Sequence, residues 1–314
     1  MKKILILLSS LRCAVYLSLI ILTWIPQTGF SQEIQNLDSL ELSFRAGKYE
    51  ESHRLMILQQ LAREHEDNNK KILYSTELID ISVEMDSIDQ TFDGYIARGH
   101  AQITKGEFSV ALEDYFEASK IAGQTGDEEQ EAIVNLAIAG GYSRLSNNEK
   151  ALEYYKYALA FFRTKETDNL PALNTGYTLF NIGEQYLFLS KPDSAKLYFN
   201  QANHIVKEHT DRLGQAYAAG SKGKAYSMLG QNELALKNLK EAVDALMELD
   251  NFFEAISEYQ LAISHIYLDQ GELESAETYA QLSLNTGEKY DLKPEMRDAN
   301  LTLSKIYKGQ GCLL

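Results

Sequence analysis

The chain has 314 residues, of which 45% are hydrophobic and 24% are charged, and its 45 acidic residues outnumber 30 Lys and Arg to give a formal net charge of −15. This composition is typical of a folded protein and not of a disordered one. The acidic balance disfavours contact with phosphate backbones and anionic lipid, so nucleic acid is not an expected partner.

The first 31 residues have the pattern of a secretory signal peptide. Lys2 and Lys3 precede an apolar stretch over residues 13–25, and the small residues of Gly29-Phe30-Ser31 follow it. A basic start, a short apolar segment and small residues before the cut are the parts of such a peptide. We expect cleavage after Ser31 and export to the periplasm.

The alternative is that residues 4–25 stay in place as a membrane anchor, provided that Arg12 is tolerated in the bilayer. Cleavage would leave Cys312 as the single cysteine, so no intramolecular disulfide would form. A membrane contact is expected only if this segment is retained or if the chain is part of a longer receptor.

After a lead-in over residues 32–49, the apolar residues follow a helical period from about residue 50 onward. Helices over 55–65 and 68–85 would form the first hairpin. In an alternative register, Gly47-Lys48-Tyr49 is the turn of that hairpin. The first repeat is therefore the least certain part of the pattern.

Further along, one phrase recurs: an Ala stands four residues before an aromatic residue or Leu and seven before a second Ala. The first alanines of the four copies are 40, 44 and 40 residues apart, and a weaker copy is Ala276-Ala280-Ser283. Self-similarity at a spacing of this size predicts a stacked array of repeats. The four copies are Ala111-Tyr115-Ala118, Ala151-Tyr155-Ala158, Ala195-Phe199-Ala202 and Ala235-Leu239-Ala242.

A second phrase, a small residue three before an aromatic, precedes the alanine phrase and places both residues on one helical face, as in Gly183 and Tyr186 or Gly223 and Tyr226. Turns such as those at Gly230 and Gly271 then close the helix. Each unit is thus a helix–turn–helix hairpin in which small residues let the helices approach. The expected packing positions are Ala111, Ala118, Ala151, Ala158, Gly183, Tyr186, Ala195, Ala202, Gly223, Tyr226, Ala235, Ala242 and Ala276. The tyrosines expected in the core are Tyr115, Tyr142, Tyr155, Tyr186, Tyr226 and Tyr267.

The segment from Leu179 to Ala202 resembles the tetratricopeptide repeat (TPR), although the repeats are longer than is usual in that family and mostly lack its helix-breaking Pro. The resemblance implies an all-α, TPR-type α-solenoid of about six helix–turn–helix repeats plus a terminal helix, in one continuous domain over residues 50–314. The expected repeats are 50–86, 89–124, 129–165, 172–208, 211–249 and 252–288, with a half repeat over 294–314.

No motif of catalysis, phosphate binding or metal binding is present, and the six histidines are scattered. We therefore expect no enzyme activity, no metal and no cofactor. Repeat arrays supply a surface, so the expected partner is a protein or a peptide.

In TPR arrays the first helix of each repeat lines a concave groove, and the resemblance implies that role for the matching faces here. Aromatic residues among single charges suit a peptide groove. Alternatively, Tyr177 and Tyr217 only pack between neighbouring hairpins. The family's clamp for a carboxylate terminus is not supported, because Asn181 lacks the accompanying lysines. The candidate groove residues are His100, Arg144, Tyr177, Phe180, Glu184, Tyr217, Lys224 and His265.

The leading hypothesis is an exported, non-catalytic scaffold that binds a protein or peptide. The array also resembles the extracytoplasmic sensor of Bacteroidota receptors whose output domain is a nucleotide cyclase or a histidine kinase. The chain ends at Cys312-Leu313-Leu314, where a second helix would begin. The alternative hypothesis is therefore a truncated sensor module of such a receptor.

Overall fold

The computed structural model describes residues 37–164 and 169–309, and in them it contains 14 α-helices, one 3-10 helix and no strand. The prediction of an all-α fold is confirmed. The expected signal peptide, the alternative anchor over 4–25 and the Cys312-Leu313-Leu314 end lie outside the described residues.

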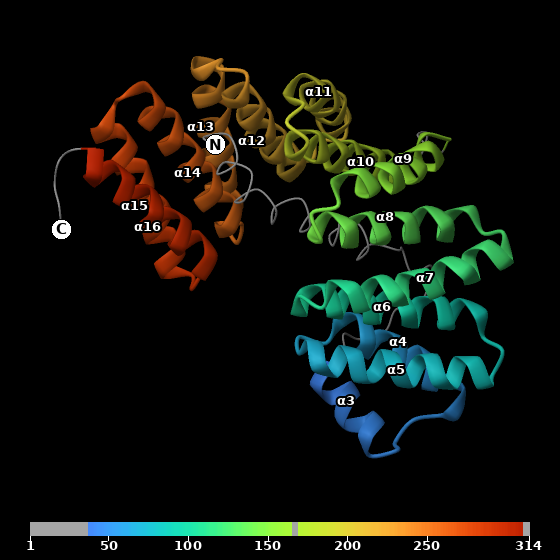
Figure 1. The fold of residues 1–314 in the computed structure, drawn as a ribbon. Coiled ribbons are helices and arrows are strands. Elements are labelled where there is room, and N and C mark those ends of the chain that lie inside the picture. The colour runs from blue at the N-terminus through green and yellow to red at the C-terminus, as the bar shows by residue number, and fades with distance from the viewer. Residues whose placement is uncertain (1–36, 165–168, 310–314) are drawn as a thin grey trace. The chain divides into compact units, whose positions relative to one another are not determined.

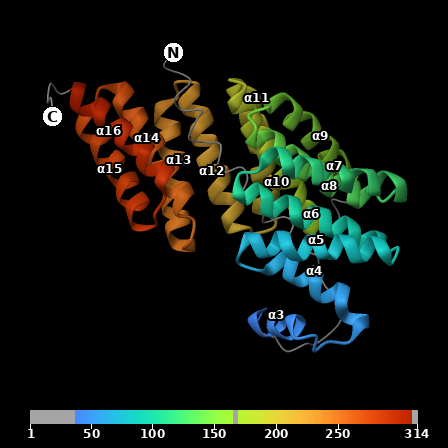
Figure 2. The same ribbon diagram turned by 60° about the horizontal axis from the view of Figure 1, so that its bottom comes forward.

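The contacts divide the array, expected as one continuous domain, into two compact units that meet in sequence between Phe161 and Phe162. In each unit, consecutive helices lie side by side (Figures 1 and 2). The first unit contains α3 (Leu37–Arg45), the 3-10 helix Glu51–His53, α4 (Arg54–Glu64), α5 (Asn68–Glu84), α6 (Ile88–Lys105), α7 (Phe108–Thr125), α8 (Glu128–Arg144) and most of α9 (Asn148–Thr164). The second contains α10 (Asn169–Phe188), α11 (Pro192–Glu208), α12 (Arg212–Met228), α13 (Asn232–Leu249), α14 (Phe253–Gln270), α15 (Leu273–Lys289) and α16 (Lys293–Gly309).

Most of these helices are followed within two residues by a residue with a left-handed backbone, where the chain reverses; α4 is an exception, since His65 after it is extended. Gly230 and Gly271, the glycines expected to close helices, have φ of 72° and 79°. At this conformation glycine carries no steric penalty, which explains its place in the turn. The non-glycine residues Ser146 and Ser190 take the same role with φ of 58° and 56°, so the turn does not depend on glycine alone.

The small residues of the repeat lie at the helix contacts. A Cβ placed on Gly99 of α6 would lie 2.8 Å from Cδ1 of Tyr115 of α7, and on Gly183 of α10 it would lie 2.6 Å from Cδ1 of Phe199 of α11. Neither site has room for a methyl group, which confirms the close approach inferred from the sequence. The alanines expected at packing positions all have no exposed surface: Ala111, Ala118, Ala151, Ala158, Ala195, Ala202, Ala235, Ala242 and Ala276.

The tyrosines expected in the core divide into two groups. Tyr115 and Tyr155, on second helices, are buried as predicted. The prediction is wrong for the first-helix tyrosines, which are only half-buried: Tyr142, Tyr186, Tyr226 and Tyr267.

These half-buried tyrosines lie in the last turn of their helix. Tyr142 stacks on Tyr154 with ring centroids 5.7 Å apart, and Tyr186 stacks on Tyr198 at 5.3 Å. At Tyr226, the ammonium group of Lys196 lies 5.9 Å from the ring centroid. The aromatic faces of these tyrosines are therefore covered by a partner side chain.

The lead-in over residues 32–49 contains α3, which is held by a buried carboxylate. Glu41 accepts hydrogen bonds from Lys70 Nζ (2.9 Å) and Tyr74 Oη (2.7 Å), and it lies 3.2 Å from His65 Nε2. These contacts, the Lys70 hydrogen bond first, lower the pKa of Glu41 to about 2. Phe44 adds apolar contact by stacking on Tyr49 with centroids 5.1 Å apart.

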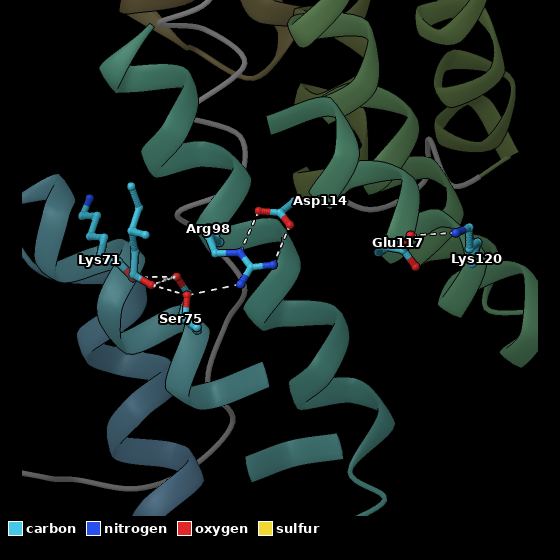
Figure 3. A network of polar contacts seen from close by, with 8 residues as sticks. Lys71, Ser75, Arg98, Asp114, Glu117 and Lys120 are labelled. Atoms are coloured by element: carbon cyan, nitrogen blue, oxygen red, sulfur yellow. Dashed lines mark hydrogen bonds and ion pairs between the residues drawn. The ribbon is translucent and has the colours of Figure 1, made fainter. Parts of the chain in front are cut away.

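A polar contact also joins three helices of the same unit (Figure 3). The guanidinium of Arg98 on α6 donates to both carboxylate oxygens of Asp114 on α7, at 2.8 and 2.7 Å, and to Thr76 Oγ1 on α5 at 3.2 Å. Asp114 is buried, and the two-pronged geometry is the one in which an ion pair best compensates the loss of water.

We expect Gly99→Ala to lower the free energy of unfolding of the first unit by about 1–3 kcal/mol, because the new methyl group would overlap the ring of Tyr115. Gly123 of α7 is the matched control, since a Cβ there would meet nothing within 4 Å. Gly123→Ala should instead stabilise the helix by about 0.5–1 kcal/mol. Chemical denaturation of both variants tests this, and equal effects would contradict the close approach.

Candidate functional site

Three positions on each first helix of the second unit carry many of the polar side chains of its helix contacts. The positions repeat every 40 or 41 residues, as in Glu184, Lys224 and His265. We call this set the first-helix row. It comprises Tyr177, Asn181 and Glu184 of α10; Tyr217, Ser221 and Lys224 of α12; Glu258, Ala262 and His265 of α14; and Asp298, Thr302 and Lys305 of α16.

The centre of the row is an ionic cluster that links three helices. Lys224 Nζ lies 2.9 Å from Glu184 Oε2 and 3.1 Å from Glu258 Oε1. Ser221 Oγ donates to the other oxygen of Glu184 at 2.7 Å. The three charged side chains are only 4–6% exposed. Buried charges are tolerated when they are paired and hydrogen-bonded, so this cluster ties α10, α12 and α14 together.

Towards α16, the row continues through a histidine. His265 Nε2 lies 2.9 Å from Thr302 Oγ1, and that hydroxyl also bonds the carbonyl oxygen of Asp298 at 3.0 Å. Because the hydroxyl has one proton, which it donates to the carbonyl, His265 must be the donor in the first contact. Burial, with a smaller contribution from the positive charge of Lys305, lowers the pKa of His265 to about 4, so the ring is neutral at pH 7.

The two tyrosines of the row contact the following repeat. Tyr177 Oη donates to Asp211 Oδ2 at 2.6 Å, and Asp211 also accepts from Gly214 N at the start of α12. Burial, followed by the bond to Asp211, raises the pKa of Tyr177. Tyr217 packs edge-on against Phe252 with centroids 6.4 Å apart. Both contacts agree with the alternative interpretation in which these rings pack between neighbouring hairpins.

Asn181 is the exception among the polar side chains of the row. It has no exposed surface, and neither its Nδ2 nor its Oδ1 has a hydrogen-bond partner among the residues described. A buried amide without partners costs roughly 1–3 kcal/mol. Such a cost at a buried position marks Asn181 as a group that could meet a ligand.

The remaining groove candidates lie elsewhere. Phe180 is 1% exposed and packs against Phe199 with centroids 5.7 Å apart, so it belongs to the contact between α10 and α11. His100 lies in the first unit, edge-on to Tyr115 at 5.6 Å. Arg144 is in the last turn of α8.

Sequence reasoning passed over Ser221, Glu258 and Thr302, which complete the contacts of Glu184, Lys224 and His265. The 40-residue spacing would have found them, since each stands in register with a residue of a neighbouring first helix.

The described residues contain no group of three or more His, Cys, Asp or Glu side chains placed to hold a metal ion. Among the same residues, no helix combines the length and the apolar character that crossing a membrane requires.

No model of a known protein family matches the chain. It is 30% identical over 106 residues to the Arabidopsis thaliana protein kinesin light chain-related 3, a match that covers 34% of this chain and 16% of that protein. It is 24% identical over 149 residues to regulatory protein RapG of Bacillus subtilis, covering 48% of this chain and 40% of RapG. The chain thus spans less than half the length of these relatives.

Solved structures are similar over more of the chain. The apo form of RapI has a TM-score of 0.66 at 18% identity, covering 82% of this chain and 93% of RapI. A Rap conjugation gene regulator of plasmid pLS20, in complex with the Phr* peptide, has 0.62 at 16%, covering 84% and 77%. A Pyrococcus horikoshii signal transduction ATPase with a tetratricopeptide repeat sensor has 0.58 at 17%, covering 87% and 44%. The chain has a TPR-type fold. This confirms the resemblance inferred from the repeats.

The low pKa of His265 predicts a pH dependence of stability. Its folded value of about 4 lies below the value of 6.5 expected in the unfolded chain, so the unfolded chain binds more protons between these limits. The contribution of neutral His265 to the unfolding free energy is therefore complete above pH 6.5, and it is lost as the pH falls towards 4. In denaturation series at several pH values, the slope of the unfolding free energy against pH gives the number of protons taken up on unfolding. His265→Gln should reduce that number by up to one in this window. An unchanged slope would contradict the assignment.

Proposed function

We propose that the chain is a non-catalytic scaffold that binds a peptide or a protein segment along the first-helix row of α10, α12, α14 and α16. The observation that carries this proposal is Asn181, whose buried carboxamide has neither donor nor acceptor satisfied among the described residues. A carboxamide offers one donor group and one acceptor, which match the C=O and N–H of a peptide main chain.

The surroundings of Asn181 supply what a peptide site needs besides main-chain contacts. Charged groups of both signs, Glu184, Lys224 and Glu258, lie on the same row and can select side chains by charge. Because their heads are nearly covered, a ligand must displace side chains or shift helices to reach them.

The comparisons support the same class of partner. The pLS20 Rap protein is described in complex with the Phr* peptide. Another Rap protein with a TM-score of 0.61, at 16% identity, is described in complex with competence and sporulation factor. Both have a fold similar to that of this chain, and this similarity supports peptide binding as the proposed role.

We also propose that the protein is exported, because residues 1–31 have the parts of a signal peptide. Amino-terminal sequencing of the native product tests this: the expected first residue is Gln32. A start at Met1 would support the uncleaved anchor over 4–25.

The alternative is a truncated sensor module of a receptor. It is motivated by the similarity to the P. horikoshii signal transduction ATPase, which has a tetratricopeptide repeat sensor. It predicts an in-frame membrane span and output domain when the gene is read past codon 314.

The scaffold proposal predicts separate effects on binding and stability at Asn181. Peptides selected from a random display library against the full chain should lose at least about tenfold in affinity for Asn181→Ala, because their main chain loses a buried pair of hydrogen bonds. The unfolding free energy should fall by no more than about 1 kcal/mol, since removal of the unpartnered amide offsets the cost of the small cavity that Ala leaves.

Asn238→Ala is the matched control, because Asn238 lies on the second helix α13 and donates to the backbone of its own helix at Leu234. Calorimetric titration should give wild-type affinity for this variant. Selection of no peptide at all, or equal binding by both variants, would count against the first-helix row as the binding surface.

A further inference from the structure

Three hydrogen-bond donors of the first hairpin converge on the carboxylate of Glu41, which α3 presents to them. From α5, Lys70 Nζ donates to Glu41 Oε2 at 2.9 Å and Tyr74 Oη donates to Oε1 at 2.7 Å. His65, which follows α4, places its Nε2 3.2 Å from Oε2. Arg45 of α3 itself adds a longer ionic contact of 3.8 Å. The hairpin therefore supplies three donors, and α3 supplies the acceptor.

The hairpin itself fixes the donor at His65. The backbone N–H of Asp67 donates to His65 Nδ1 at 2.9 Å. A ring nitrogen that accepts a hydrogen bond has no proton, so the neutral ring carries its proton on Nε2, the atom that faces Glu41. His65 and Tyr74 are only 8% and 3% exposed. Because buried donors need an acceptor, this part of the hairpin is suited to a carboxylate.

An apolar surface surrounds the three donors. Leu40 precedes Glu41 directly and Phe44 follows it by three residues, and both pack into a cluster with apolar residues of the hairpin such as Leu61. The same cluster reaches Ala97 of α6, so the hairpin has an apolar contact with the next helix that does not involve α3. The site thus accepts one helical pattern: an apolar residue, an acid next to it, and an aromatic residue three positions after the acid.

The helix α3 depends on these contacts for its place. It has nine residues, fewer than the roughly 12–15 that an isolated helix needs in water. It is the first helix of the unit and packs on α4 (Figure 1), and its outer face is open, since Leu42 is 69% exposed. Residues 46–50, which follow it, contain no helix, and at Gly47 an added Cβ would meet nothing within 4 Å. Loss of α3 from the hairpin therefore requires little change in the rest of the unit.

We propose that the α4–α5 hairpin is a binding site for an amphipathic helix of a partner protein, and that α3 is a built-in ligand which occupies this site until the partner helix replaces it. The partner helix presents a carboxylate to Lys70, His65 and Tyr74. It places apolar side chains where Leu40 and Phe44 now lie. The site belongs to the first unit, so the inference is independent of the first-helix row of the second unit.

Two considerations bear on the source of the replacing helix. Copies of a chain with a net charge of −15 repel each other, which disfavours α3 of a second copy and favours a different protein. The chain's own α3 competes at the high effective concentration that a short connection gives. A partner helix therefore binds more weakly to the intact chain than to a chain whose α3 is disabled.

A peptide with the sequence of residues 37–49, labelled with fluorescein and amidated, tests the competition. Its binding to the full chain is measured by fluorescence anisotropy. Phe44→Ala in the chain weakens the built-in ligand, so this variant should bind the peptide at least about tenfold more tightly than the wild-type chain does. Leu42→Ala is the matched control, because Leu42 lies on the exposed face of the same helix. It should bind within about twofold of the wild-type chain.

The same peptide with Glu41→Gln tests the carboxylate. The change keeps the shape of the side chain and removes its charge, so the affinity for the Phe44→Ala chain should fall at least about tenfold. Tyr74→Phe, added to Phe44→Ala in the chain, removes one donor and keeps the ring. It should narrow the difference between the two peptides at least about threefold, whereas a merely structural effect would weaken both peptides equally.

The outcomes separate the parts of the proposal. Equal affinity of the wild-type and Phe44→Ala chains, including no binding by either, overturns the built-in ligand. Equal affinity of the two peptides overturns recognition of a carboxylate. If Phe44→Ala does not fold, as judged by circular dichroism, Glu41→Gln in the chain takes its place, and the same tighter binding is expected. Dimers of the wild-type chain in sedimentation equilibrium that Glu41→Gln abolishes would assign the site to α3 of a second copy and overturn the partner helix.

Discussion

The contact on which the rest of the structure depends is the close crossing of two helices, where the first helix contributes a glycine and so has no side chain of its own. At Gly99 and Gly183 an aromatic ring from the second helix lies flat against the first, where even a methyl group would not fit. On the second helices, fully buried alanines likewise allow the two helices to approach closely. Because each hairpin repeats this crossing, the first helices line up and place residues 40 or 41 positions apart next to one another.

That alignment turns single polar residues into a connected row. Glu184, Lys224 and His265 are each one polar residue in a largely apolar helix contact, and none has a sequence motif around it. Stacking brings Glu184 and Lys224 to 2.9 Å, and it brings His265 to 2.9 Å from Thr302 of the next first helix. The candidate site is therefore a product of the repeat spacing and not of any local constellation, which is why its chemistry is that of recognition.

How much of this could be predicted from the sequence depends on what set each feature. The helix crossings were predictable because packing in a repeat is strictly periodic, and the fully buried Ala151 and Ala195 follow that period. The partial exposure of Tyr186 was not predictable from the period, since one face of a helix can be buried at its middle and exposed at its end. Phe180 was assigned to a groove by resemblance, whereas its neighbour Phe199 takes it into the hairpin core.

The site could be predicted only in part for a related reason. Periodicity indicates which residues share a position of the repeat, such as Tyr177 and Tyr217, or Glu184, Lys224 and His265. It does not show which atoms meet. Lys224 and Glu258 are in contact although they hold different positions of the repeat, the third on α12 and the first on α14. The lack of partners at the Asn181 amide depends on side-chain angles that no spacing encodes.

The bridge through Lys224 bears on how the second unit melts. In a linear array each hairpin touches only its neighbours, and such arrays lose structure from their ends. Lys224 holds carboxylates from the hairpins on both sides, so α12 cannot open without disturbing α10 and α14 at once. The middle of this unit should thus behave as a single cooperative block whose backbone amides exchange last, while hairpins outside the bridge fray independently.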